Sequence, residues 1–66
     1  MILPYKNIQP KIAERTFIAP DAWITGDVEI AEDVSIFFGV SIRGDIMPIK
    51  IGRGSNVQEN SVIHTS

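Results

Sequence analysis

Branched aliphatic residues recur along this chain at intervals of six positions. The interval is held without a slip from Ile12 to Ile42, and after three additional residues it resumes at Ile51 and continues to Ile63. Polar residues, glycine and proline lie between these positions, as a chain requires where it changes direction. A six-residue period fits neither the three-and-four spacing of an amphipathic helix nor the strict alternation of a long strand. It predicts very short strands separated by corners.

Three such units make one triangular coil, and residues one coil apart should stack at the ~4.8 Å spacing of paired strands. The repeats from Ile12 onward are enough for about three coils. The expected fold is therefore an all-β, parallel hexapeptide-repeat solenoid, and a small sandwich of short strands is the alternative. Three interior ladders are predicted: Ile12 over Ile30 over Ile51, Ile18 over Ile36 over Val57, and Ile24 over Ile42 over Ile63.

The repeat pattern also divides the chain. Residues 1–11 lack the repeat and are expected to lie across the coils, and residues 12–66 are expected to form the solenoid. The segment 43–50 contains the three additional residues, which predicts a short loop projecting from one corner; an insertion without a role is the alternative. The last repeat carries no closing glycine, proline or charge cluster. We therefore expect a fragment of a longer solenoid, truncated at its C-terminus.

Composition and charge exclude several classes of function. The 66 residues carry a net charge of -2, and the six Lys and Arg residues are scattered singly, which argues against nucleic acid as a partner. The chain has neither a long apolar stretch nor a secretory signal, so we expect a cytoplasmic protein with no membrane contact. The absence of cysteine excludes disulfides and a cysteine-based zinc finger.

The candidate chemistry gathers near the insertion. His64 is the only histidine and stands at an outward position of its repeat, which suits either a metal ligand or an exposed, hydrogen-bonded histidine. Stacking places Arg43 beside His64, with the carboxylates Asp45 and Glu59 nearby. Zinc catalysis uses three protein ligands, more than this chain can supply alone. A surface ion pair between Arg43 and Asp45 is the alternative interpretation.

Two aromatic residues, Phe37 and Phe38, occupy a corner where other repeats have small or polar residues. An exposed apolar patch at an outer corner indicates a protein contact. The alternative is that both rings pack under the N-terminal segment 2–8. We favour an interface.

Several of these residues together resemble the gamma-class carbonic anhydrases and their bacterial relatives once called ferripyochelin-binding proteins. The resemblance lies in Ile42-Arg43-Gly44-Asp45, in the stretches 48–52 and 55–60, and in Val62-Ile63-His64. It implies a left-handed parallel β-helix that forms a homotrimer, with a metal, usually zinc, between two subunits. The handedness comes from the resemblance alone.

The same resemblance implies roles for individual residues. His64 corresponds to the first of three histidine ligands, and the other two would fall beyond Ser66. Arg43 and Asp45 correspond to a pair that ties neighbouring subunits together and shapes the site.

Three further residues correspond to catalytic positions. Asn56 and Gln58 match polar residues of the active site, with Gln58 close to the metal-bound water. Glu59 stands where the family usually has Asp, and Ile46 follows Asp45 where the archaeal prototype carries an acidic proton-transfer residue nearby.

The implied function is that of the N-terminal part of an enzyme that hydrates CO2 to bicarbonate with a metal-bound hydroxide at a subunit interface. Zinc, or another divalent metal, would bind only if the missing histidines were supplied, so the 66-residue chain alone is expected to be inactive. One alternative is a hexapeptide acyltransferase-like enzyme with a histidine general base. Another is a non-catalytic β-solenoid that assembles through its open edges.

Overall fold

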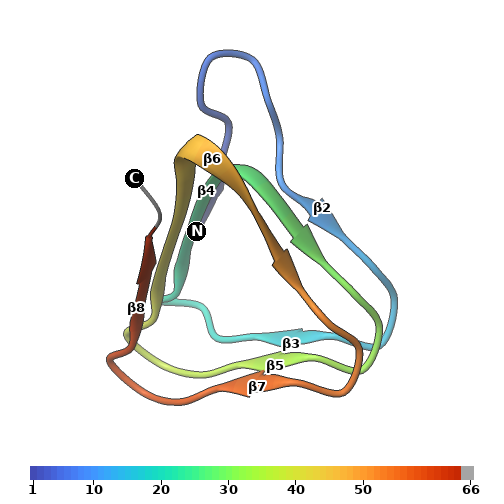
Figure 1. Cartoon of the computed structure of the whole chain (residues 1–66). Helices are drawn as coiled ribbons and strands as arrows, with labels where there is room; N and C mark the ends of the chain where they lie inside the picture. The colour runs from blue at the N-terminus through green and yellow to red at the C-terminus, as the bar shows by residue number, and fades with distance from the viewer. Residues whose placement is uncertain (65–66) are drawn as a thin grey trace.

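Short parallel strands wind into a triangular coil in the computed structural model, which describes residues 1–64 (Figure 1). Thr65 and Ser66, the last residues of the predicted solenoid, lie outside the described residues. All pairings between the named strands are parallel. In chain order the strands are β1 (Ile2–Leu3), β2 (Lys11–Ile12), β3 (Phe17–Ile18), β4 (Trp23–Ile30), β5 (Ser35–Ile36), β6 (Ser41–Ile51), β7 (Asn56–Val57) and β8 (Val62–His64).

The strand register confirms the three predicted ladders. Strands β2, β4 and β6 stack so that Ile12 pairs with Ile30 and Ile30 with Ile51. The other two ladders follow the same order on the remaining faces, through β3, β5 and β7 and through β4, β6 and β8. The hexapeptide-repeat solenoid is therefore the fold of this chain.

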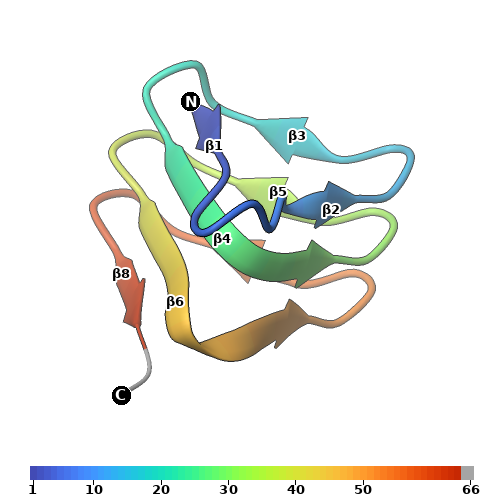
Figure 2. The ribbon, with the colours of Figure 1, turned by 90° about the horizontal axis from the view of Figure 1, so that it is seen from above.

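The coil is left-handed. In Figure 1 the chain runs clockwise from β2 along β3 to β4, and Figure 2 shows that the later strands β6 and β8 lie toward the viewer of Figure 1. A path that turns clockwise while approaching the viewer is a left-handed helix. This agrees with the handedness implied by the family resemblance.

The core is the column of aliphatic side chains inside the triangle. Ile24, Ile36 and Ile42 are completely buried, because each lies between two paired strands. Ile12 and Ile63, near the two ends, are only partly buried and pack against this core. Apolar burial is thus continuous along the axis and weakest at the ends, as in other stacked repeats.

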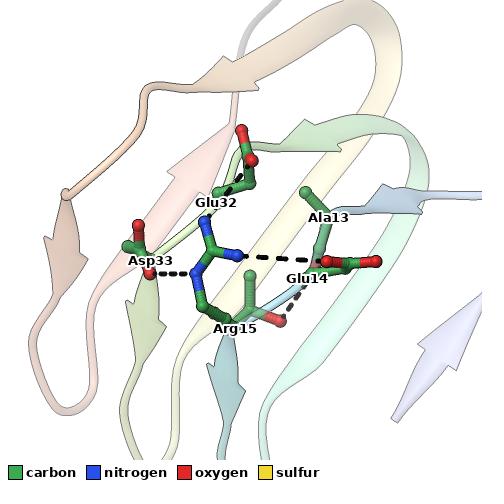
Figure 3. Close-up of polar contacts among 6 residues, drawn as sticks. Ala13, Glu14, Arg15, Glu32 and Asp33 are labelled. Atoms are coloured by element: carbon green, nitrogen blue, oxygen red, sulfur yellow. Dashed lines mark hydrogen bonds and ion pairs between the residues drawn. The ribbon is translucent and has the colours of Figure 1, made fainter.

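One corner of the triangle is built from residues in the left-handed backbone region. Arg15, Asp33 and Gly54 have φ values of 57°, 58° and 78° in three successive coils. The Arg15 Nε donates a hydrogen bond to Asp33 Oδ1 at 2.9 Å, and the guanidinium also faces Glu32 and Glu14 (Figure 3). The hydrogen bond to Asp33 raises the pKa of Arg15 above its ordinary value. Because these side chains are exposed, the cluster contributes little to stability.

The three additional residues lie within β6 at another corner. Gly26 of β4 pairs with Gly44 of β6, but the next paired residues are Val28 and Ile49, so residues 45–48 lie opposite Asp27 alone. The strand assignment of β6 continues through the whole segment 43–50, and Ile46 is exposed at its tip. The additional residues of β6 form the top corner of the triangle in Figure 1, at the label β6.

The N-terminal segment lies against the same face as β4. Residues Ile2 and Leu3 pair with the start of β4. A turn closed by hydrogen bonds between Tyr5 and Ile8 then leads to β2, which pairs with the end of β4.

None of residues 1–64 belongs to a helix that could cross a membrane.

Two glycines allow the coils to approach closely beside the insertion. A Cβ added at Gly44 would overlap the backbone carbonyl of Asp27, and one added at Gly26 would lie 2.6 Å from the carbonyl oxygen of Gly44. Gly26 also has a φ of 82°, which side chains rarely tolerate. The backbone between Arg43 and Asp45 therefore packs directly against the preceding coil.

Replacement of Gly44 by alanine should destabilise the chain by about 1–3 kcal/mol, because the new methyl group meets backbone that cannot rotate away. Gly52→Ala is the matched control, since its Cβ would meet only Ser55 Oγ at 4.0 Å. The measurement is the urea midpoint followed by far-ultraviolet circular dichroism. Equal midpoints for the two variants would contradict the close approach at Gly44.

Candidate functional site

Neighbouring strands β6 and β8 bring Arg43, Asp45 and His64 together. Arg43 and His64 are paired in register, and each follows an interior isoleucine, so alternation along the strand points both side chains outward. Asp45 stands two residues after Arg43 and shares its face. The predicted proximity of Arg43 and His64 is confirmed.

The three side chains contact one another directly. Arg43 Nη2 lies 3.1 Å from His64 Nδ1 and 3.2 Å from His64 Nε2. His64 Nε2 lies 3.0 Å from Asp45 Oδ1, and Arg43 Nε lies 3.3 Å from Asp45 Oδ2. The Asp45 and His64 side chains are 19% and 27% exposed, whereas that of Arg43 is 54% exposed. The surface ion pair considered from the sequence is present, and it is also joined to the histidine.

The donor and acceptor chemistry of this cluster fixes the tautomer of a neutral His64. A carboxylate only accepts hydrogen bonds, and a guanidinium only donates them. Asp45 Oδ1 must therefore accept from a protonated Nε2, which leaves the lone pair of the neutral ring on Nδ1. The imidazole is held with a defined nitrogen protonated and a defined nitrogen bearing the lone pair.

Asp45 is held in its ionised form. Burial by itself raises the pKa of this carboxyl, but the hydrogen bonds from His64 and from its own backbone N–H, with the charges of His64 and Arg43, outweigh it and lower the pKa. A carboxyl whose pKa is lower in the folded chain stabilises the fold above its ordinary pKa. That contribution is lost as the pH falls through the lowered value.

Residues 1–64 of a single copy do not provide a complete metal site. Among residues 1–64 no group of three histidine, aspartate or glutamate side chains is placed to hold a metal ion. The His64 and Asp45 pair does have the chemistry of one metal ligand with its orienting carboxylate. The chain therefore offers one imidazole and lacks the remaining ligands within the described residues.

The other predicted catalytic residues lie on a different face of the triangle. Asn56 is in β7, and its Oδ1 accepts a hydrogen bond from Gln58 Nε2. Gln58 and Glu59 follow β7 and are exposed. Within the described part of the chain, no hydrogen bond or ion pair joins these three residues to His64. A single copy thus keeps the two groups of polar side chains apart.

The aromatic pair lies on the face that carries Asn56. Phe37 and Phe38 follow β5, and their ring centroids lie 5.9 Å and 6.2 Å from that of Phe17 in the preceding coil. Phe17 and Phe38 are nearly half exposed. The N-terminal strand instead pairs with β4 on another face. The three rings form an apolar patch that this chain leaves partly open to solvent.

Sequence reasoning did not identify two features of the site. The hydrogen bond between His64 and Asp45 was not expected. Arg43 and Asp45 are two residues apart in a strand and therefore share a face, which would have placed Asp45 near His64. The close approach of Gly26 and Gly44 was also missed, although both occupy the same position in successive coils.

Known proteins resemble this chain in both sequence and fold. A carbonic anhydrase from Geobacillus kaustophilus is 52% identical over all 66 residues, which cover 36% of that protein. Gamma carbonic anhydrase 1, mitochondrial, from Arabidopsis thaliana is 39% identical over 57 residues, which cover 86% of this chain and 21% of that protein. A hexapeptide transferase family protein from Anaplasma phagocytophilum has a solved structure that superimposes with a TM-score of 0.91 at 41% identity. That match covers 92% of this chain and 37% of that one.

The matches cover between 21% and 37% of the length of these relatives. No protein-family model matches the chain. The sequence identities nevertheless confirm the resemblance found from the residues themselves.

Replacement of Asp45 by alanine should shift neutral His64 from the single Nε2–H tautomer toward a mixture, because the acceptor that selects it is removed. Nitrogen-15 NMR of the imidazole measures the two forms, and the single histidine makes the assignment unambiguous. Glu59→Ala removes an equal charge away from the ring and should leave the tautomer unchanged. An unaltered tautomer ratio in Asp45→Ala would show that Asp45 does not select it.

Proposed function

Since this chain is a homologue of the gamma-class carbonic anhydrases, we propose that the protein to which it belongs hydrates CO2 to bicarbonate. The proposed enzyme is a lyase that uses zinc or another divalent metal at a site between subunits of a homotrimer. The chain contributes residues to that site from two of its faces.

The observation that carries the proposal is the fixed imidazole of His64. Its Nε2 is 3.0 Å from the Asp45 carboxylate, which orients the ring and defines the tautomer. Carboxylates behind histidines serve this purpose in metal sites, where they orient the ring and raise its basicity.

The residues of this chain have distinct proposed roles. A divalent metal, when bound, supplies a water activated at neutral pH. His64 provides one imidazole ligand. Gln58 donates its amide N–H to Asn56, so its Oε1 remains free to accept a hydrogen bond from a reacting water. Glu59, the neighbouring exposed carboxylate, is the proposed proton acceptor.

The separation of the two polar groups supports assembly of the site between copies. His64 lies on the β6–β8 face and Gln58 beside the β3–β5–β7 face, so they can share one site only if unlike faces of two copies meet. Contacts between unlike faces close into rings when the rotation allows it, and a trimer is one such ring. The partly exposed rings of Phe37 and Phe38 suit the apolar centre of this interface.

Two other functions remain as alternatives to carbonic anhydrase activity. The Anaplasma relative is described as a hexapeptide transferase family protein, which favours an acyltransferase with His64 as general base. Within residues 1–64, β7 and β8 each pair on one side only, which favours a non-catalytic assembly module. Binding of coenzyme A would support the first, and growth into species larger than a trimer would support the second.

His64→Ala, tested in the full-length protein, should lose bound zinc and reduce CO2 hydration by about 100-fold or more, because a ligand is removed. Gln58→Ala should retain zinc and lower kcat by roughly 10–1000-fold, because only a hydrogen-bonding group is lost. Stopped-flow hydration assays and metal analysis measure the two effects. Thr25→Ala is the control, since Thr25 stacks above Arg43 in the same outward column.

Full zinc content and activity in His64→Ala would overturn the assignment of this ligand. The 66-residue chain by itself should show no CO2 hydration above background, because its described residues do not complete a metal site. Activity of the isolated chain would contradict the proposal that copies and further ligands are required.

A further inference from the structure

We propose that Arg43 is a positioning residue for His64, which covers one face of the imidazole while Asp45 holds its edge. Arg43 Nη2 lies 3.1 Å from Nδ1 and 3.2 Å from Nε2 of the same ring. A point in the ring plane that is equally close to both nitrogens would overlap other atoms of the ring. Nη2 therefore lies above the ring face, at a large angle to the in-plane lone pair of Nδ1.

Asp45 anchors both of the other side chains. Its Oδ1 lies 3.0 Å from His64 Nε2, and its Oδ2 lies 3.3 Å from Arg43 Nε. The three side chains thus form a closed cycle in which each contacts the other two. The hydrogen bond from Nε2 fixes one point on the edge of the ring, about which the ring could still tilt. Contact with Arg43 on the ring face restricts this remaining motion.

The shape of the guanidinium allows a single residue to make both contacts. Nε and Nη2 are separate donors in one rigid plane, so Nε can face Asp45 while Nη2 lies over His64. The planar, weakly hydrated guanidinium is also well suited to lie against an aromatic face. A lysine ammonium has one nitrogen on a flexible stem and cannot occupy both places. The arrangement therefore requires the planar fork, and positive charge alone does not provide it.

Arg43 covers the face of the ring and not its edge. The lone pairs of imidazole nitrogens lie in the ring plane, so a metal ion that approaches His64 in this plane meets a ring whose orientation is already set. The part of the inference that concerns metal rests on the proposed ligand role of His64, but the positioning of the ring does not. This role within one copy is additional to the contact between subunits that the family resemblance implies for Arg43.

The first test measures the mobility of the His64 ring without metal. Carbon-13 relaxation of the imidazole gives an order parameter, and the chain contains a single histidine. Citrulline in place of Arg43, introduced by chemical synthesis, keeps the length and the planar fork but removes the charge, and should leave the ring ordered. Arg43→Lys keeps the charge and loses the fork. Its order parameter should fall by about 0.2 or more, the difference between rigid and flexible groups.

Arg53→Lys is the matched control for this test. It makes the same change at a residue that forms no ion pair within residues 1–64, and the ring should stay as ordered as in the unmodified chain. Circular dichroism verifies that each variant is folded. Equal order parameters for Arg43→Lys and the unmodified chain would overturn the inference. A citrulline variant as mobile as the lysine variant would also overturn it, because the charge would then hold the ring.

The second test titrates zinc into the full-length protein. Arg43→Lys should bind zinc about 2–10-fold more weakly than Arg53→Lys, because a mobile ring has to be ordered on binding. Weaker binding supports the positioning of His64 for a metal, and equal binding by the two variants contradicts it. Failure of every variant to bind zinc would contradict the proposed ligand role of His64, whereas the positioning of its ring is decided by the first test.

Discussion

The stacking of one coil on the next is the constraint on which the rest of this structure depends. Each strand pairs in parallel with the strand one coil away, and the interior isoleucines lie directly over one another. Because side chains alternate between faces, a slip of one residue would bring polar side chains into the core. The hydrophobic ladder therefore sets the register, and the register sets which outward side chains become neighbours. Arg43 and His64 meet for this reason.

The insertion changes this regular stacking at one corner only. Residues 45–48 face Asp27 alone, and the register is restored at Ile49, so the ladder beyond the corner is undisturbed. Gly26 and Gly44 absorb the close approach of the two coils just before the extra residues. The insertion thus lies beside the cluster of Arg43, Asp45 and His64, and Asp45 is the first residue after the regular pairing stops. A rigid coil with one altered corner is a suitable support for a site that requires a fixed imidazole.

In the proposed function, the distribution of polar residues over two faces lets a solenoid contribute to catalysis although residues 1–64 do not complete a site. His64 and Asp45 form a preorganised pair on one face, and Gln58 with Asn56 forms another beside β7. The relatives with which this chain shares its sequence are longer, and the chain spans 36% of the Geobacillus carbonic anhydrase. In our proposal the remaining ligands come from outside the described residues. The solenoid sets the distance between the His64–Asp45 pair and the Gln58–Asn56 pair.

The sequence by itself determined the coil, its ladders and the column that contains Arg43 and His64. These follow from a six-residue period in which each interior position is occupied by a branched aliphatic residue, and that information is local. The tertiary structure decided the handedness, the approach of Gly26 to Gly44, and the contacts of both His64 nitrogens with Arg43 and Asp45. Such contacts depend on side-chain directions and on distances of about 3 Å between different coils. Periodicity places residues in the same column, but only the packed coils fix which atoms face each other.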